Sequence, residues 1–274
     1  MRATWLPWKH RVAMHLSRIL LYPIKSLPPL EVREAEVTAM GILRHDRRWA
    51  LADPAGNYIH GKRTPALHQI RTSYSPDLTE VTLTAGAHGP ARFPLIEASL
   101  QPLASWFTRV LGQRVVVIED REQGFPDDLK ANGPTLVSEA SLQTVGDWFG
   151  WGLEEVRYRF RTNLEVAGAP PFWEDRLCDA TEGGVLFRVG SVELQGCNPC
   201  QRCGVPSRNP MSGEATPGFQ GEFSRRREEA LPSWAEPALF NHHYRFALNT
   251  RVRAGQAGSR IRVGDPVVLP GLQP

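Results

Sequence analysis

Short runs in which apolar and polar residues alternate recur along this 274-residue chain. Examples are "SRILLYPI" (17–24), "EVTLTAG" (80–86) and "GVLFRVGSVELQG" (184–196), and turn residues such as the "DPAGN" of 53–57 separate them. Alternation with a period of two is typical of strands that bury one face, and Gly, Pro, Asn and Asp between such runs favour turns. The pattern predicts a mainly β fold with a few helices, built from antiparallel, barrel-like sheets.

Two segments instead have the apolar spacing of helices. In 97–113, Ser99 can cap a helix that ends at Gly112, and one face carries Leu100, Leu103, Phe107, Val110 and Leu111. In 138–151, Ser138 can cap a helix with an apolar stripe that is better explained as core than as a cofactor contact. Strands are expected to resume at "VRYRF" (156–160) and "NLEVAG" (163–168).

The segment "REQGFPDDLKANGP" (121–134) is rich in Gly, Pro and Asp, so we expect a linker or flexible loop there. It divides the chain into a first domain over 15–120 and a second over 121–274. Residues 1–14 are expected to be a flexible extension, because they combine charge with proline and because Met14 offers a second start.

Composition excludes several classes of function. A net charge of +3, without lysines interleaved with stacking aromatics, gives no reason to expect nucleic acid. No apolar run approaches the ~20 residues of a membrane helix, so no membrane partner is expected. Four cysteines are too few for a disulfide scaffold, and their clustering favours metal or redox chemistry in a reducing, cytoplasmic setting.

Three of these cysteines, Cys197, Cys200 and Cys203, stand three residues apart in "GCNPCQRCGVPSRNP" (196–210). A structural zinc site usually has two pairs of ligands, and the second pair is missing here; Cys178 with His242 or His243 could complete a site, but nothing in the spacing demands it. An iron–sulfur cluster of the C-x2-C-x2-C-x3-C-P type matches the first three cysteines and then fails at Ser207.

The third possibility is a single reactive thiolate. A strand is expected to end after "SVELQG", which would place the cysteines on a connection at the edge of the sheet. Arg202 would favour the thiolate form of its neighbour Cys203. A soft thiolate on a polar loop is a good ligand for a thiophilic metal that a cofactor brings.

Six motifs occur in a telling order: "YPIKSL", "TAMGILRHDRRWALAD", "SEASL", "RFRTNLEV", "CQRCGVP" and "VGDPV". In this order they resemble proteins with an N-terminal MOSC β-barrel domain followed by a MOSC β-barrel domain, such as the mitochondrial amidoxime-reducing components and their bacterial relatives. The resemblance covers nearly all of residues 16–269. It implies a molybdenum cofactor (Mo-molybdopterin) held between the two domains.

The resemblance also implies roles for particular residues. Cys203 matches the cysteine that binds molybdenum, whereas Cys200 matches a neighbour that is not a ligand, and Cys197 has no assigned role. The matched cofactor contacts are Lys25, Ser26, Arg47, Arg161 and Asn163. Lys and Arg suit the cofactor's phosphate, and an asparagine side chain offers the pterin both a donor and an acceptor.

Two departures from the family pattern stand out. The chain reads "ANGPTLV" where relatives have an Asp-Thr-Ser-like stretch, and Asn132 and Gly133 would stand in there through backbone groups. Residues 206–217 replace an acidic turn of the relatives, which would change substrate access.

The implied activity is reduction of small N-hydroxylated or N-oxide substrates by oxygen-atom transfer to molybdenum. Electrons would come from a separate protein, of the ferredoxin, b-type cytochrome or flavin reductase kind. The alternative is a carrier or binding module for the cofactor or for sulfur, without turnover, as in cofactor sulfurases.

Overall fold

A computed structural model of the protein describes residues 13–96, 100–181 and 184–269, and strands predominate in it. The expected mainly β class with a few helices is therefore confirmed. The α-helices of the described part are α1 (Leu100–Leu111), α2 (Glu139–Phe149), α3 (Leu153–Phe160) and α4 (Phe219–Glu229). None of the helices described is long and apolar enough to cross a membrane. The expected Ser99 cap and nearly all of the expected extension lie outside the described residues.

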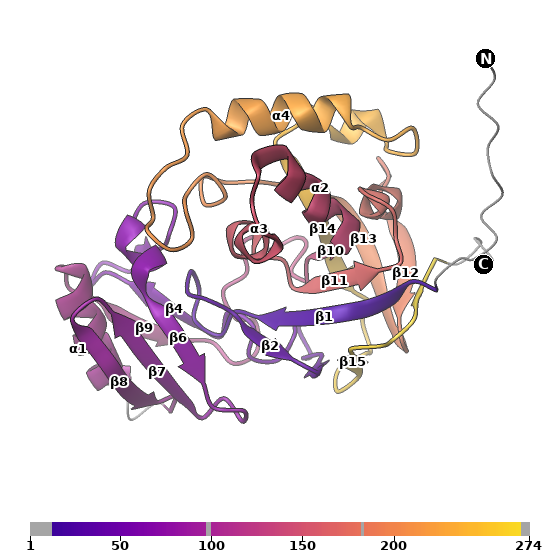
Figure 1. The fold of residues 1–274 in the computed structure, drawn as a ribbon. Coiled ribbons are helices and arrows are strands. Elements are labelled where there is room, and N and C mark those ends of the chain that lie inside the picture. The colour runs from indigo at the N-terminus through magenta and orange to yellow at the C-terminus, as the bar shows by residue number, and fades with distance from the viewer. Residues whose placement is uncertain (1–12, 97–99, 182–183, 270–274) are drawn as a thin grey trace, which may run out of the picture.

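The largest sheet combines strands from both halves of the chain (Figure 1). Its order is β16 (Val267–Val268), β12 (Val185–Val189), β13 (Val192–Gln201), β14 (Arg245–Val252), β10 (Leu136–Ser138), β11 (Leu164–Ala167), β1 (His15–Leu21) and β2 (Leu30–Val32). Pairing of β1 with β11 buries Leu16 and Ile19 in the core of the second half. The strand pairs described leave this sheet open rather than closed as a barrel, although an antiparallel bridge between His15 and Pro266 links β1 to the segment before β16.

The smaller sheets are formed mainly by strands of the first half. They are β5 (Tyr58–Ile59) with β4 (Trp49–Ala52) and β9 (Val116–Glu119), β6 (Arg71–Tyr74) with β7 (Glu80–Ala85) and β8 (His88–Pro94), and β3 (Glu34–Glu36) with β15 (Arg260–Arg262). Helix α1 packs against the first two through a second core that contains Trp49 and Phe107. The apolar face predicted for residues 97–113 is therefore the face that α1 buries.

Helices α2, α3 and α4 enclose a third core, which is rich in aromatic rings. The predicted cap of α2 is confirmed, because the Ser138 side chain accepts a hydrogen bond from the Ser141 amide at 3.1 Å. Helix α4 was not expected from the sequence. Phe219 and Phe223, four residues apart, bury one face of it, and the rest of its surface is polar.

The strand expected at 156–160 is wrong, because these residues form the end of α3. Val156 and Phe160 fit an alternating pattern, but they are also four residues apart, so a helix brings both to one fully buried face. Arg157 leaves the helix toward β11, where its Nη2 lies 2.8 Å from the Oε2 of buried Glu165. The alternating pattern assumes that a polar residue such as Arg157 is exposed. In the structure, Arg157 is buried beside a carboxylate instead.

The expected linker, residues 121–134, has no helix or strand but is tied to both halves. The Phe125 amide bonds to the Arg47 carbonyl at 2.9 Å, and the Gly133 amide bonds to the Thr250 carbonyl of β14 at 2.9 Å. A side chain at Gly133 would meet Thr250 at 2.8 Å, so glycine permits this close approach. The segment is therefore held between the two halves by backbone hydrogen bonds to each of them.

Candidate cofactor site

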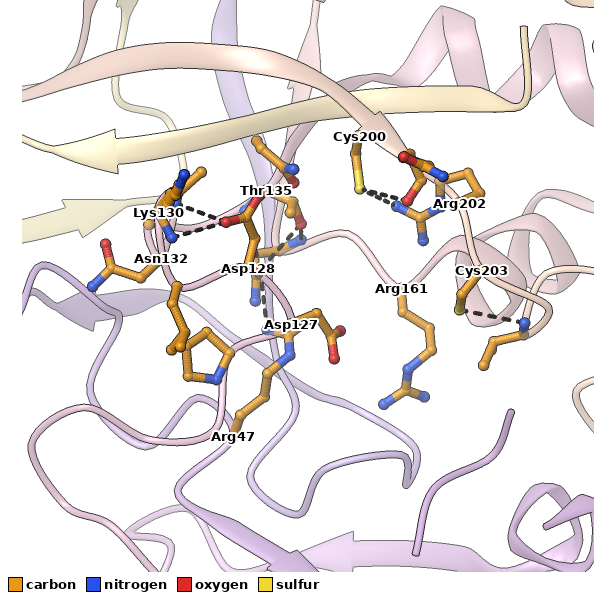
Figure 2. Close-up of a pocket in the computed structure, with 18 of the residues that line it drawn as sticks. Arg47, Asp127, Asp128, Lys130, Asn132, Thr135, Arg161, Cys200, Arg202 and Cys203 are labelled. Atoms are coloured by element: carbon orange, nitrogen blue, oxygen red, sulfur yellow. Dashed lines mark hydrogen bonds between the residues drawn. The ribbon is translucent and has the colours of Figure 1, made fainter. Parts of the chain in front are cut away.

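A cavity of about 1210 Å³ opens where the two halves and the 121–134 segment meet (Figure 2). All the residues that the family resemblance implicates line it: Lys25, Ser26, Arg47, Asn132, Gly133, Arg161, Asn163 and Cys203. They come from segments that lie up to about 180 residues apart in the chain, so the fold has gathered them.

The two arginines of this set are placed by one tyrosine. Tyr22 is fully buried, and the guanidinium carbons of Arg161 and Arg47 lie 4.3 and 5.2 Å from its ring centroid. Stacking on an aromatic face holds a guanidinium without consuming its N–H donors. Among the described contacts, the Arg161 side chain makes one hydrogen bond, at 2.7 Å to the Leu27 carbonyl. Most donors of Arg161 are thus left for a ligand.

An uncommon backbone conformation occurs at three of the predicted positions, as it does at four described residues outside the cavity lining. Ser26, Arg47 and Arg161 have φ values of 73°, 51° and 55°, in the left-handed region that non-glycine residues seldom adopt. Residues held in this region cluster at binding and catalytic sites, because the surrounding structure must over-determine them. The strain at three of the predicted positions therefore supports a functional role for the cavity.

Two of the cationic side chains in the cavity form ion pairs with carboxylates. Lys25 Nζ lies 2.7 Å from Asp127 Oδ1, and Arg47 forms an ion pair with Asp46. Burial acts to raise the pKa of Asp127, but the charges of Arg47 and Lys25 outweigh it and lower the pKa to about 2. Asp127 therefore stays charged at neutral pH, and an incoming phosphate would replace or join it beside Lys25.

Asn163, a predicted pterin contact, is largely committed to the protein itself. Its Oδ1 accepts from the Thr135 amide at 3.2 Å and from the Thr135 hydroxyl at 3.1 Å, and its Nδ2 donates to the Leu20 carbonyl at 2.9 Å. It is 1% exposed. Asn163 thus holds β1 against the start of β10, and its effect on a ligand is mainly through the neighbours that it positions.

The three cysteines differ in their surroundings. The expected end of the strand after Gly196 is wrong, because β13 continues to Gln201 as an interior strand between β12 and β14. Irregular pairing on either side of Asn198 and Pro199 disguises this continuation in the sequence. Cys203 alone of the three follows the strand's end, and it is exposed at the cavity.

Arg202 acts differently from our expectation. Its Nη1 donates to the Cys200 Sγ at 3.1 Å rather than to Cys203, whose Sγ accepts from the Val205 amide at 3.5 Å. Cys200 lines the cavity with Cys203, whereas Cys197 does not. Burial raises the pKa of the Cys197 thiol, which favours the uncharged form.

A multi-ligand metal centre built from these residues finds no support in the described chain. No group of three or more His, Cys, Asp or Glu side chains is placed there to hold one metal ion. Of the interpretations open at the sequence level, zinc or a cluster would require such convergence. The geometry instead offers Cys203 as the most exposed thiol at the cavity, with the partly buried Cys200 beside it.

The remaining chemistry of the cavity fits a large anionic cofactor. Seven lysine and arginine side chains line it against three aspartates. Among described atoms, buried nitrogens of lining residues Arg202 (Nε), Arg245 (Nε) and His60 (Nδ1) have no hydrogen-bond partner. A ligand with many acceptor oxygens and nitrogens would satisfy such donors. The cation excess and the soft thiol together match a phosphate-bearing cofactor that carries a metal.

Sequence reasoning missed several residues that shape this site. Tyr22 lies inside the motif "YPIKSL" and Asp46 inside "HDRRW". Their position in these motifs was the available signal. Asp127 and Thr135 gave none, because their partners Lys25 and Asn163 lie far away in the chain.

Comparison with known proteins agrees with this geometry. Residues 13–113 match the family model "MOSC N-terminal beta barrel domain", and residues 135–268 match the model "MOSC domain". The chain belongs to the MOSC-domain proteins. The predicted boundary between residues 120 and 121 falls in the segment that neither model matches, and it stays a prediction.

Among curated relatives, this MOSC-domain protein is 27% identical to mitochondrial amidoxime-reducing component 1 of Mus musculus, over 93% of this chain and 82% of the relative. It is 23% identical to the Homo sapiens protein of the same name, over 98% and 88%. It is 22% identical to the molybdenum cofactor sulfurase of Solanum lycopersicum, over 93% of this chain but about a third (36%) of that protein. Among solved structures, YiiM of Geobacillus stearothermophilus matches with a TM-score of 0.32 at 17% identity, over 50% of this chain and 53% of YiiM.

Proposed function

We propose that this MOSC-domain protein binds the molybdenum cofactor in the cavity and reduces small N-hydroxylated or N-oxide compounds. The observation that carries the proposal is the convergence of all the residues implicated by resemblance on one cationic cavity that contains an exposed cysteine. The similarity to proteins named amidoxime-reducing components supports the same substrate class.

Particular residues would hold the cofactor. Lys25, Arg47 and Arg161 supply the positive charge that a phosphate needs, and Cys203 supplies the soft sulfur ligand for molybdenum. When bound, the cofactor supplies two-electron oxygen-atom transfer, which none of the twenty side chains performs alone. The protein's own share is to orient the ligand: Tyr22 fixes the two arginines, and Asn163 fixes the strands beside them.

The stoichiometry of the proposed reduction determines which co-reactants the protein needs. Reduction of an amidoxime breaks the N–O bond, consumes two electrons and two protons, and yields an amidine and water. The sequence contains no glycine-rich phosphate loop for a nicotinamide cofactor, so we propose that a separate electron-transfer protein delivers the electrons. We place this reaction in the cytoplasm, as the cysteine content predicts.

A carrier without turnover is the second candidate. Similarity to molybdenum cofactor sulfurases favours it, as does the exposure of Cys203, because an accessible thiol also suits sulfur transfer. Both candidates place the cofactor in the same cavity, and they differ in whether a substrate is reduced there.

Turnover separates the two candidates. Protein produced in a host that makes the cofactor is mixed with reduced methyl viologen and benzamidoxime, and benzamidine is quantified by chromatography. The reductase proposal predicts benzamidine from the wild type and from Cys197→Ala, whose thiol is outside the cavity lining, but none from Cys203→Ala. NADH or NADPH alone should give none. Molybdenum-loaded wild type that reduces neither benzamidoxime nor an N-oxide would refute the reductase and leave the carrier.

A further inference from the structure

Lys62 lies at the cavity next to the proposed metal ligand. Its exposed side chain lines the cavity, and its Cγ is 4.0 Å from where a Cβ on Gly204, the residue after Cys203, would stand. In the described structure the Lys62 ammonium forms no hydrogen bond and no ion pair. A lysine that lines a cavity beside the reacting centre, without a partner of its own, is free to bind a ligand.

The charged groups that act most strongly on His60 and His68, two histidines that line the cavity with Lys62, are all cations. Burial lowers the pKa of His60, and the positive charges of Arg63, Lys62 and Lys25 act in the same direction. Burial also lowers the pKa of His68, and there the charged neighbours are Arg161, Arg208 and Arg159. The direction of both shifts is the one that a positive potential at this end of the cavity would produce.

The carboxylates of the cavity are engaged elsewhere. Asp46 pairs with Arg47, and Asp127 pairs with Lys25. Asp128 accepts hydrogen bonds from the amides of Lys130 and Ala131. None of the three forms an ion pair with Lys62 in the described structure, so its ammonium is open to an anion that enters the cavity.

We propose that the substrate carries a carboxylate in addition to its N-hydroxyl or N-oxide group, and that Lys62 binds this carboxylate. The proposal rests on the proposed function, because it assumes that the reacting group approaches Cys203. Lysine is suited to the task, because its ammonium is a compact charge with three donors on a flexible stem. Charge-assisted hydrogen bonds between an ammonium and a carboxylate are stronger than hydrogen bonds between neutral groups.

Binding tests the proposal independently of turnover. Calorimetric titration compares benzamidoxime with 4-carboxybenzamidoxime on cofactor-loaded wild type, Lys62→Gln, Lys62→Arg and Arg63→Gln. Arg63→Gln is the matched control, since it removes a neighbouring cation that does not line the cavity. The wild type should bind the carboxylated compound about tenfold more tightly. Lys62→Gln should abolish this preference, Lys62→Arg should retain part of it, and Arg63→Gln should leave it intact.

Equal affinity of the wild type for the two compounds would overturn the proposal, and so would a preference that Lys62→Gln retains. Loss of the preference in Lys62→Gln and Arg63→Gln alike would also overturn it, because net charge rather than contact would then be responsible. If the preference depends on Lys62 but neither compound is reduced, the binding proposal stands and the reductase proposal fails. The two failures are thus distinguishable.

Discussion

At the scale of single residues, the cavity depends on side chains that fix other side chains. The family resemblance assigns no role to Tyr22, yet both site arginines stack on its ring. The two guanidinium groups repel each other, and stacking on one ring holds them close in spite of this repulsion. Burial lowers the pKa of Arg161 most, and the charge of Arg47 lowers it further. A phosphate anion between these groups would relieve that repulsion, so cofactor binding and local stability are expected to be coupled.

Asn163 gives a prediction at this scale. Asn163→Ala removes the acceptor for the partly buried Thr135 amide and the donor for the buried Leu20 carbonyl. The free energy of unfolding should fall by about 1–3 kcal/mol, which urea unfolding of the cofactor-free protein would measure. Asn132→Ala, also at the cavity but bonded to the Met40 carbonyl at a more accessible position, should change it much less.

A different result would reassign the residue. If Asn163→Ala kept its unfolding free energy and lost only cofactor affinity, Asn163 would be a direct ligand contact, as the sequence resemblance implied, and not a residue that positions others.

Residue identities at the site were predictable only through the order of motifs. Taken singly, Lys25 or Arg47 is a common surface residue type, and its pattern in the chain carries no sign of the cavity. The contacts of Asp127 with Lys25 and of Asn163 with Thr135 join residues 102 and 28 positions apart. One sequence contains no record of such pairs, because they are properties of the fold.

At the scale of elements, periodicity succeeded where one face of a helix or strand is buried and its partner is regular. Helices α1 and α2 and strand β7 follow that rule. It failed at α3, where arginines at buried positions mimic the polar face of a strand, and at β13, where irregular pairing interrupts the alternation. Ion-paired burial and bulged strands both break the link between polarity and exposure on which such prediction depends.

The short helix η3 (Trp173–Leu177) places the buried acid Glu174 against the N-terminal end of α2. Glu174 is 1% exposed, and its Oε2 accepts from the Ser141 hydroxyl at 3.0 Å and from the Ser138 amide at 3.3 Å. Burial and the neighbouring charge of Asp175 raise its pKa to about 7. Folded protein therefore retains a proton that the unfolded chain releases as the pH rises above about 4.5.

The sign of the pH effect follows. Because the folded state binds more protons than the unfolded state in this window, stability contributed by Glu174 falls as the pH rises from about 4.5 to about 7. Glu174→Gln keeps the side chain neutral. It should match wild type near about pH 5 and exceed its unfolding free energy near about pH 8 by up to about 3 kcal/mol.

Urea unfolding at the two pH values measures this difference. The exposed change Asp147→Asn, on α2, serves as the control and should follow wild type at both. A Glu174→Gln variant with the same pH dependence as wild type would show that Glu174 is already charged in the folded protein.

At the scale of the whole molecule, the cavity exists because the two halves share a sheet. Strand β1 joins the strands of the second half, and β3 pairs with β15 near the other end of the chain. The sequence predicted two barrel-like units with a ligand between them. The sequence did not predict that strands of the two halves pair with each other, because pairing between strands some 150 residues apart leaves no local pattern.

The central claim is that Cys203 alone of the clustered cysteines binds molybdenum in this shared cavity. The most direct test is the molybdenum content of wild type, Cys197→Ala, Cys200→Ala and Cys203→Ala, all purified from a host that makes the cofactor. We predict stoichiometric molybdenum in wild type, near-normal content in Cys197→Ala and Cys200→Ala, and a large loss in Cys203→Ala, whose cofactor-free form should melt at the same temperature as cofactor-free wild type. A wild type without molybdenum, or an equal loss of metal in all three variants, would contradict the claim.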